Sequence, residues 1–191
     1  MKSNSRTYQR KYLRAPFKNC VLYVSDDFVF KAYALNISEG GMLLDQVGHF
    51  PDNSVLTFMV NLPQFPQFKN FNLERMQTYS LESMAFKTVR FEARLVRKIG
   101  VDTKVDGVFT SRIGLQFEEI SPFDQAKISN YVDNFSSNLI YLQVLIDSIN
   151  SDKNNVAKIR TLSKMLGYAS DLKISYLRKI VEHDYKSLQW L

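Results

Sequence analysis

Two arginines four residues apart, Arg10 and Arg14, stand just before Pro16 and a run of strand-forming residues. A guanidinium is a planar fork of five N–H donors, so it binds phosphate and the O6/N7 edge of guanine in the same bidentate way. It also stacks on purine rings. Because Pro16 disfavours a helix just before it, we expect the pair in a loop that leads into a strand. Two arginines there could hold a ligand with both guanine and phosphate groups.

A second polar segment, Asn-Ile-Ser-Glu-Gly-Gly, occupies residues 36–41. Asn36 can present both a donor and an acceptor to a base edge, and Ser38 adds a hydroxyl. Gly40 and Gly41 permit positive φ and let the backbone come close to a ligand. The same residues also suit an ordinary turn between two strands, and the segment taken alone favours that interpretation.

Both segments would need a β framework to position them. Residues with strand patterning recur from Asn19 to Ile120, and no helix alternates with them. This pattern predicts six short antiparallel strands that form a small closed or half-closed barrel. Residues 63–84 fit neither period and could form a short helix, a lid or a mobile excursion. The expected strands are residues 20–24, 28–35, 41–45, 54–62, 85–99 and 108–120, with a hairpin turn at Ser25-Asp26-Asp27.

The period changes at Ser121, where Ser, Pro and Asp form a helix-start signal. Apolar residues then recur at spacings of four and three, which predicts a helix over 122–150 with a heptad seam. Two shorter helices, about 153–166 and 169–189, are expected on either side of Gly167. The seam could pack inside the chain or pair with a second copy to give a homo-oligomer. Its members are Ile128, Val132, Phe135, Leu139, Leu142, Ile146 and Ile149.

These patterns predict three segments: a basic N-terminal arm (1–18), a barrel (19–121) and a helical extension (122–191). The arm holds six lysines and arginines and no acid, which equals the whole net charge of +6. Such a concentration indicates an anionic partner: nucleic acid, acidic lipid or a small phosphate ligand. A solubilising tail is the alternative.

Composition excludes several other classes. Hydrophobic residues make up 45% of the chain, enough for a packed core, and no apolar run approaches the ~18 residues of a membrane span. The first residues lack the apolar core of a secretory signal. Cys20 is the single cysteine, so neither an internal disulfide nor a thiolate metal cluster is expected. These features predict a cytoplasmic protein.

No catalytic signature is found. The two histidines, His49 and His183, are far apart in sequence, and no Walker loop, nucleophile elbow or metal-ligand spacing is present. We therefore expect no enzyme activity, no catalytic or metal-binding residues and no cofactor.

Taken together, the two polar segments resemble the PilZ domain family, whose pattern is RxxxR followed by (D/N)xSxxG. The matching residues here are Arg10, Arg14, Asn36, Ser38 and Gly41, and residues 112–132 are similar to the family's closing strand and helix. The resemblance implies a six-stranded barrel that binds cyclic di-GMP, a bacterial second messenger. It also implies that the arginines contact phosphates and guanine edges, that Asn36 and Ser38 bond a guanine, and that Gly41 keeps the surface open.

The resemblance suggests a receptor in which the anionic ligand cancels the repulsion between the arginines and orders the arm against the barrel. Contact between the arm and the helices would then couple binding to an unknown downstream protein or to self-association. Two alternatives remain. A barrel with a basic arm could bind single-stranded nucleic acid by stacking bases on aromatics, such as Phe17, Tyr23, Phe28, Phe30 and Tyr33. A barrel without ligand could act as an adaptor.

Overall fold

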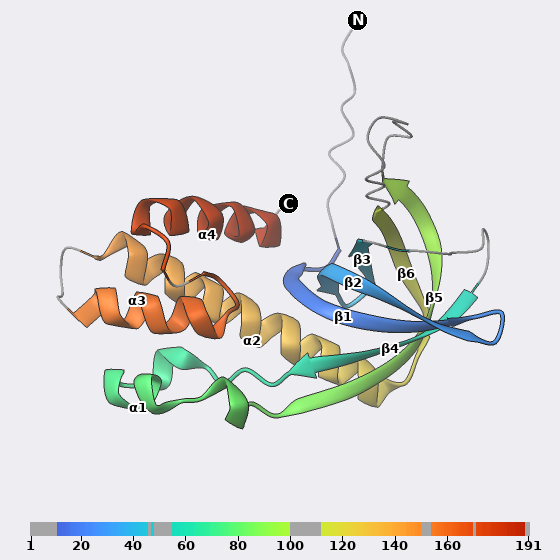
Figure 1. The fold of residues 1–191 in the computed structure, drawn as a ribbon, viewed down its shortest axis with the longest axis horizontal. Helices are drawn as coiled ribbons and strands as arrows, with labels where there is room; N and C mark the ends of the chain where they lie inside the picture. Colours follow the sequence, from blue (N-terminus) through green and yellow to red (C-terminus); the bar gives the residue numbers. More distant parts are fainter. Residues whose placement is uncertain are drawn as a thin grey trace, which may run out of the picture.

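The computed structural model describes residues 11–45, 47, 55–99, 112–149, 154–169 and 171–189. Figure 1 shows them as a β-barrel beside a group of helices, with one long helix running between the two parts. Several sequence predictions lie outside the described residues, among them the placement of Arg10, that of His49, and strand structure at residues 108–111.

Six antiparallel strands close into a barrel in the order β1-β2-β3-β6-β5-β4. This arrangement confirms the predicted fold class. Each of the six neighbouring pairs around the ring is hydrogen-bonded, so the sheet closes on itself. The strands are β1 (Ala15–Ser25), β2 (Phe28–Ser38), β3 (Gly41–Asp45), β4 (Val55–Pro63), β5 (Phe86–Ile99) and β6 (Arg112–Ile120).

Aromatic side chains fill the barrel because alternate residues of each strand point inward. Tyr23 stacks on Phe58 and Phe58 stacks on Phe91, with ring centroids 5.5 Å apart in each pair. The β1–β2 hairpin turns at Asp26 and Asp27, whose φ angles are +49° and +64°. Two consecutive positive φ values are typical of a type I′ turn, so the expected hairpin turn is confirmed.

Strand β1 begins at Ala15, five residues before the expected start at Cys20. Ala15 and Pro16 pair with Ile37 and Asn36 of β2, and the pairing shifts register between Pro16 and Asn19. The irregularity accommodates Pro16, which cannot donate a ladder hydrogen bond. Residues 15–18 are therefore part of the barrel wall, and Arg14 stands directly at the start of the first strand.

The long helix α2 (Pro122–Asp147) begins as predicted, since the hydroxyl of Ser121 accepts a hydrogen bond from the Asp124 amide at 3.0 Å. Its seam faces the interior of the chain. Six of the seven predicted seam residues are at most 3% exposed, and Ile149 is partly buried. The seam is thus satisfied within one chain by the barrel and the two following helices.

Two shorter helices pack against α2: α3 (Asn154–Met165) and α4 (Ile174–Gln189). Helix α3 ends at Met165 and is followed by Gly167, which has a φ of +80°. Tyr168 N–H bonds the Ser163 carbonyl and Gly167 N–H bonds the Lys164 carbonyl, the pattern of a Schellman C-cap. Helix α4 starts five residues later than expected, at Ile174, and Arg160 donates a hydrogen bond to the carbonyl of Leu172 two residues before it.

The segment between β4 and β5 folds into three short turns: η1 (Phe68–Asn70), α1 (Leu73–Thr78) and η2 (Leu81–Ser83). Buried Asn138 of α2 holds it. The Asn138 side chain accepts a hydrogen bond from the Phe68 amide at 2.9 Å and donates one to the Pro66 carbonyl at 2.8 Å. Of the three possibilities for residues 63–84, the short helix is therefore correct, and the segment is anchored to the long helix.

Within the described ranges, no helix is both long and apolar enough to cross a membrane. The same residues contain no group of three or more His, Cys, Asp or Glu side chains suited to hold a metal ion. His183 is largely exposed on α4, where its Nδ1 lies 3.2 Å from a carboxylate oxygen of Asp184.

Candidate ligand-binding site

The β1–β2 register brings Arg14 to the second polar segment. Ala15 pairs with Ile37 and Pro16 pairs with Asn36. Because the strands are antiparallel, Arg14, one residue before Ala15, lies at the same end of the ladder as Ser38, one residue after Ile37. The structure thus places Arg14 beside the 36–41 segment, although the two are more than twenty residues apart in sequence.

Asn36 lies on the outer face of the barrel and is half-buried. Its neighbours along β2, Ala34 and Ile37, point into the core, and the β2–β3 pairing shifts register between Ala34 and Asn36. Such bulges re-aim a side chain and are frequent near functional sites. The side-chain amide of Asn36 forms no hydrogen bond with another residue in the described ranges. It is therefore positioned on the surface with donor and acceptor available.

Ser38 and Gly41 close the turn between β2 and β3. The Ser38 hydroxyl donates a hydrogen bond to the Gly41 carbonyl at 3.1 Å, and Ser38 is 6% exposed. A Cβ atom on Gly41 would lie 2.2 Å from the carbonyl oxygen of Leu115 on β6. Neither Gly40 nor Gly41 adopts the positive φ that the sequence allows. Gly41 is needed because β3 and β6 pass closely there.

Tyr12 connects the arm to this turn. A Cβ atom on Gly40 would lie 2.9 Å from two ring carbons of Tyr12, so the ring lies directly over Gly40. The Lys11 ammonium lies 5.0 Å from the centre of the same ring. Interaction with the Tyr12 phenol raises the pKa of Lys11 above the usual range. The part of the arm that the structure describes therefore packs on the 36–41 turn.

Helix α2 holds the same turn from the other side. Gln125 donates a hydrogen bond to the Glu39 carbonyl at 3.2 Å, and the Ser129 hydroxyl donates one to the Glu39 carboxylate at 2.7 Å. Phe117 N–H of β6 bonds the Gly40 carbonyl at 3.1 Å. The turn is thus fixed to both β6 and α2.

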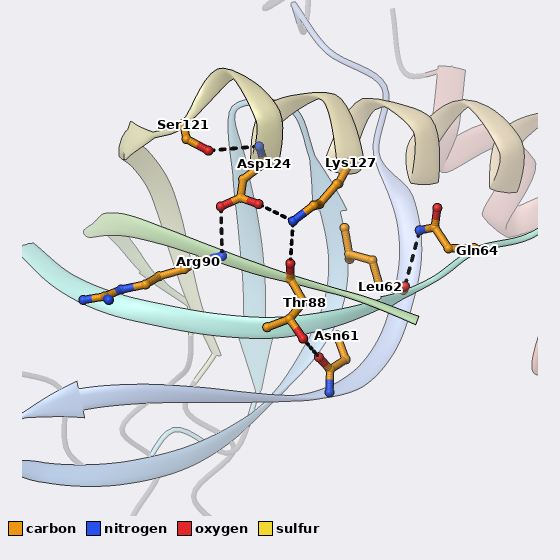
Figure 2. Close-up of polar contacts among 8 residues, drawn as sticks. All are labelled: Asn61, Leu62, Gln64, Thr88, Arg90, Ser121, Asp124 and Lys127. Atoms are coloured by element: carbon orange, nitrogen blue, oxygen red, sulfur yellow. Dashed lines mark hydrogen bonds and ion pairs between the residues drawn. The ribbon is translucent and has the colours of Figure 1, made fainter. Parts of the chain in front are cut away.

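The first turns of α2 are also attached to β5, as Figure 2 shows. Asp124 accepts a hydrogen bond from the Arg90 amide at 3.5 Å and pairs with Lys127 at 2.7 Å. Lys127 donates a further hydrogen bond to the Thr88 carbonyl at 2.9 Å. Both charged side chains are mostly buried, so this pair is more rigid than a surface ion pair. Helix α2 and the barrel therefore form one unit at this end.

The start of β1 contacts the helical region directly. Tyr131 of α2 donates a hydrogen bond from its phenol to the Pro16 carbonyl at 2.7 Å, and its ring packs edge-on against Phe17 at 5.3 Å. Burial raises the pKa of Tyr131 well above its ordinary value. The Lys18 ammonium lies 5.8 Å from the centre of the Tyr168 ring, beyond α3. The strand that follows Arg14 is thus joined to the helices within four residues.

A cleft of about 400 Å³ lies between the start of β1, the 63–84 segment and the helices. Pro16, Lys18, Tyr131 and Tyr168 are among its lining residues, which do not include Arg14, Asn36, Ser38 or Gly41. Tyr168 donates a hydrogen bond to Asp184 at 2.8 Å, and burial, assisted by that carboxylate, raises the pKa of Tyr168 above its ordinary value. This cleft is separate from the residues of the two motifs.

Gln125, Ser129 and Tyr131, which hold the site, were not predicted from the sequence. Polar residues on an amphipathic helix give no signal of what they contact. The aromatic residues considered for base stacking differ in their exposure. Phe17 and Tyr23 are each 1% exposed, whereas Phe28 and Tyr33 are 67% and 42% exposed. The buried pair is part of the core and cannot stack on a nucleic acid.

Comparison with protein families finds a match to the PilZ domain over residues 8–134, well over half of the chain. The chain belongs to the PilZ domain family, in agreement with its six-stranded barrel. No enzyme family is indicated. A comparison with curated proteins finds no match.

Solved structures give distant similarities. The inhibitor of motility MotI/DgrA of Bacillus subtilis is 16% identical with a TM-score of 0.44, over 65% of this chain and 49% of that one. The PilZ domain of YcgR from Escherichia coli with c-di-GMP is 15% identical with a TM-score of 0.41, over 66% and 91%. PlzA of Borreliella burgdorferi in complex with c-di-GMP is 11% identical with a TM-score of 0.34, over 66% and 51%. The aligned part thus spans about half the length of the first and third proteins.

Proposed function

We propose that this protein is a receptor for cyclic di-GMP that acts in the cytoplasm, without enzymatic activity of its own. The observation that carries the proposal is the β1–β2 register, which sets Arg14 at the same end of the ladder as Ser38. Arg14, whose guanidinium is able to bind phosphate and guanine, thereby lies near the 36–41 segment, in which the side-chain amide of Asn36 can bond a base edge. Membership of the PilZ domain family supports the same ligand.

In this proposal Arg10 and Arg14 contact the phosphates and guanine edges of the ligand, and Asn36 and Ser38 bond a guanine. The Ser38 hydroxyl already donates its hydrogen bond to the Gly41 carbonyl, so it can only accept a hydrogen bond from the ligand. Gly41 contributes indirectly, because its missing side chain lets β3 lie against β6. The ligand has two guanines and two phosphates, the groups for which the arginine fork is matched.

We further propose that ligand binding orders the arm and that the ordered arm alters a surface used by a protein partner or a second copy of the chain. The contacts of Tyr12 with Gly40 and of Tyr131 with Pro16 support this path, since they border Arg14 on both sides. Tyr12 and Leu13 are 37% and 44% exposed, so they are candidates for the altered surface. The division into an arm (1–18), a barrel (19–121) and helices (122–191) stays a working proposal.

Isothermal titration calorimetry with cyclic di-GMP tests the receptor proposal, with cyclic di-AMP and GTP as control ligands. Arg10→Ala and Arg14→Ala should each weaken binding by at least about tenfold, because each removes charge-assisted hydrogen bonds of ~1.5–3 kcal/mol. Arg90→Ala is the matched control. It removes one exposed positive charge from β5, at a position that pairs with Met59 of β4. No binding by the full chain, or native affinity in both arm variants, would reject the proposal.

A further inference from the structure

The outer face of the barrel contains a row of residues that continues from the candidate site to the far strand. Pro16 pairs with Asn36, Asn36 with Leu43, Leu43 with Gly114, and Gly114 with Arg97. The row thus crosses β1, β2, β3, β6 and β5 in turn. Asn36 and Arg97 are three strands apart, or about 14 Å at a strand spacing of about 4.8 Å.

The surface along this row is shallow at Gly114, because this residue has no side chain. A Cβ atom there would lie 3.7 Å from the Cβ of Arg97 and 3.9 Å from a methyl group of Val96. Both side chains therefore start from the outer face, beside the space above Gly114. The β5–β6 register shifts between Leu95 and Arg97, a bulge that turns both residues to this side.

Arg97 is the arginine on this edge that is available for a ligand. Its neighbour Arg94 is held in an ion pair with Glu118 at 2.6 Å. The Arg97 side chain is exposed and forms no hydrogen bond or ion pair with another residue in the described ranges. Arg14 and Arg97 thus stand at opposite ends of a strip whose centre is formed by Asn36, Leu43 and Gly114.

We propose that Arg97 is a further ligand-binding residue, which contacts the second guanine or a phosphate of the nucleotide from the side opposite to Arg14. The inference rests on the proposed cyclic di-GMP function and extends it to a residue outside both sequence motifs. A flat purine lies on the Leu43 side chain and above Gly114, which adds no side chain of its own, and the guanidinium stacks on it or bonds its edge. The same strip disfavours ligands too short to reach both arginines.

Calorimetry on the full chain tests this with cyclic di-GMP and four variants. Arg97→Gln should weaken binding by about tenfold or more, since a charge-assisted hydrogen bond is lost. Arg90→Gln removes the same charge from the same strand away from the row, and should change affinity by less than about twofold. Arg97→Lys keeps the charge without the fork and should give an intermediate affinity. Gly114→Gln should weaken binding at unchanged melting temperature, because its side chain fills this shallow surface.

The outcomes separate this inference from the function on which it rests. If the full chain binds and Arg14→Ala does not, but Arg97→Gln binds as well as Arg90→Gln, the Arg97 assignment is wrong and the receptor stands. If the full chain fails to bind cyclic di-GMP, both are wrong. Equal losses in Arg97→Gln and Arg90→Gln would indicate general electrostatic attraction and would also reject a contact by Arg97.

Discussion

The phenol of Tyr131 on α2 donates a 2.7 Å hydrogen bond to the carbonyl oxygen of Pro16, two residues after Arg14. This bond ties the start of the first strand to the long helix. Because α2 also holds Glu39 of the 36–41 turn, one helix supports both halves of the candidate site. The stability of α2 and the geometry of the candidate site should therefore be linked.

Tyr131→Phe should lower the free energy of unfolding by about 1–3 kcal/mol, because the partly buried Pro16 carbonyl loses its partner while the ring volume is kept. The affinity for cyclic di-GMP should fall severalfold, since the strand start that positions Arg14 is less restrained. Urea unfolding and calorimetry measure the two effects. Tyr141→Phe on the same helix is the matched control. Equal effects of the two variants would contradict the role given to Tyr131.

Gly41→Ala should destabilise the barrel by more than about 2 kcal/mol, since the added Cβ would meet the Leu115 carbonyl at 2.2 Å. Gly114→Ala is the control: its Cβ would meet only ordinary contacts at 3.7 Å or more, so a change within about 1 kcal/mol is expected. Thermal unfolding of both variants makes the comparison. A stable, folded Gly41→Ala that has lost ligand binding would instead favour a direct contact at Gly41.

Leu139→Ala should cost about 2–5 kcal/mol of stability, as a cavity forms in the α2 seam, where Leu139 is fully buried. Ile140→Ala, at the next position and 43% exposed, should cost less than about 1 kcal/mol. Light scattering should give both variants the oligomeric state of the unmodified chain, because the seam packs within one chain. Dissociation of an oligomer by Leu139→Ala without loss of stability would contradict this.

Alkaline pH should destabilise the fold through Tyr131 and Tyr168. Burial raises both pKa values above the ordinary 10.0, so the folded state favours neutral phenols. This contribution to stability is fully present below pH ~10. Above pH ~10 the free energy of unfolding falls by about 1.4 kcal/mol per pH unit for each tyrosine. Urea unfolding at pH 9 and 11 measures the loss, which should be clearly smaller in the double variant Tyr131→Phe/Tyr168→Phe. An equal loss in both proteins would exclude these phenols as its source.

Local sequence signals predicted much of the architecture correctly. The hairpin at Asp26-Asp27, the N-cap at Ser121 and the apolar seam of α2 each depend on residues within a few positions of one another. The boundaries that were wrong depended on distant partners. Ala15 became strand by pairing with Ile37, and the carbonyl of Leu172, just before α4, is bound by the distant Arg160.

For the candidate site, the sequence by itself determined the chemistry: guanidinium, amide and hydroxyl groups suited to a guanine nucleotide, and a glycine at a turn. The tertiary structure decided which groups share a surface. The strand register sets Arg14 beside Ser38, and barrel closure sets Arg97 in the row of Asn36. Residue types and local periodicity depend on short stretches of chain, whereas strand register and barrel closure depend on the packing of strands that are far apart in sequence.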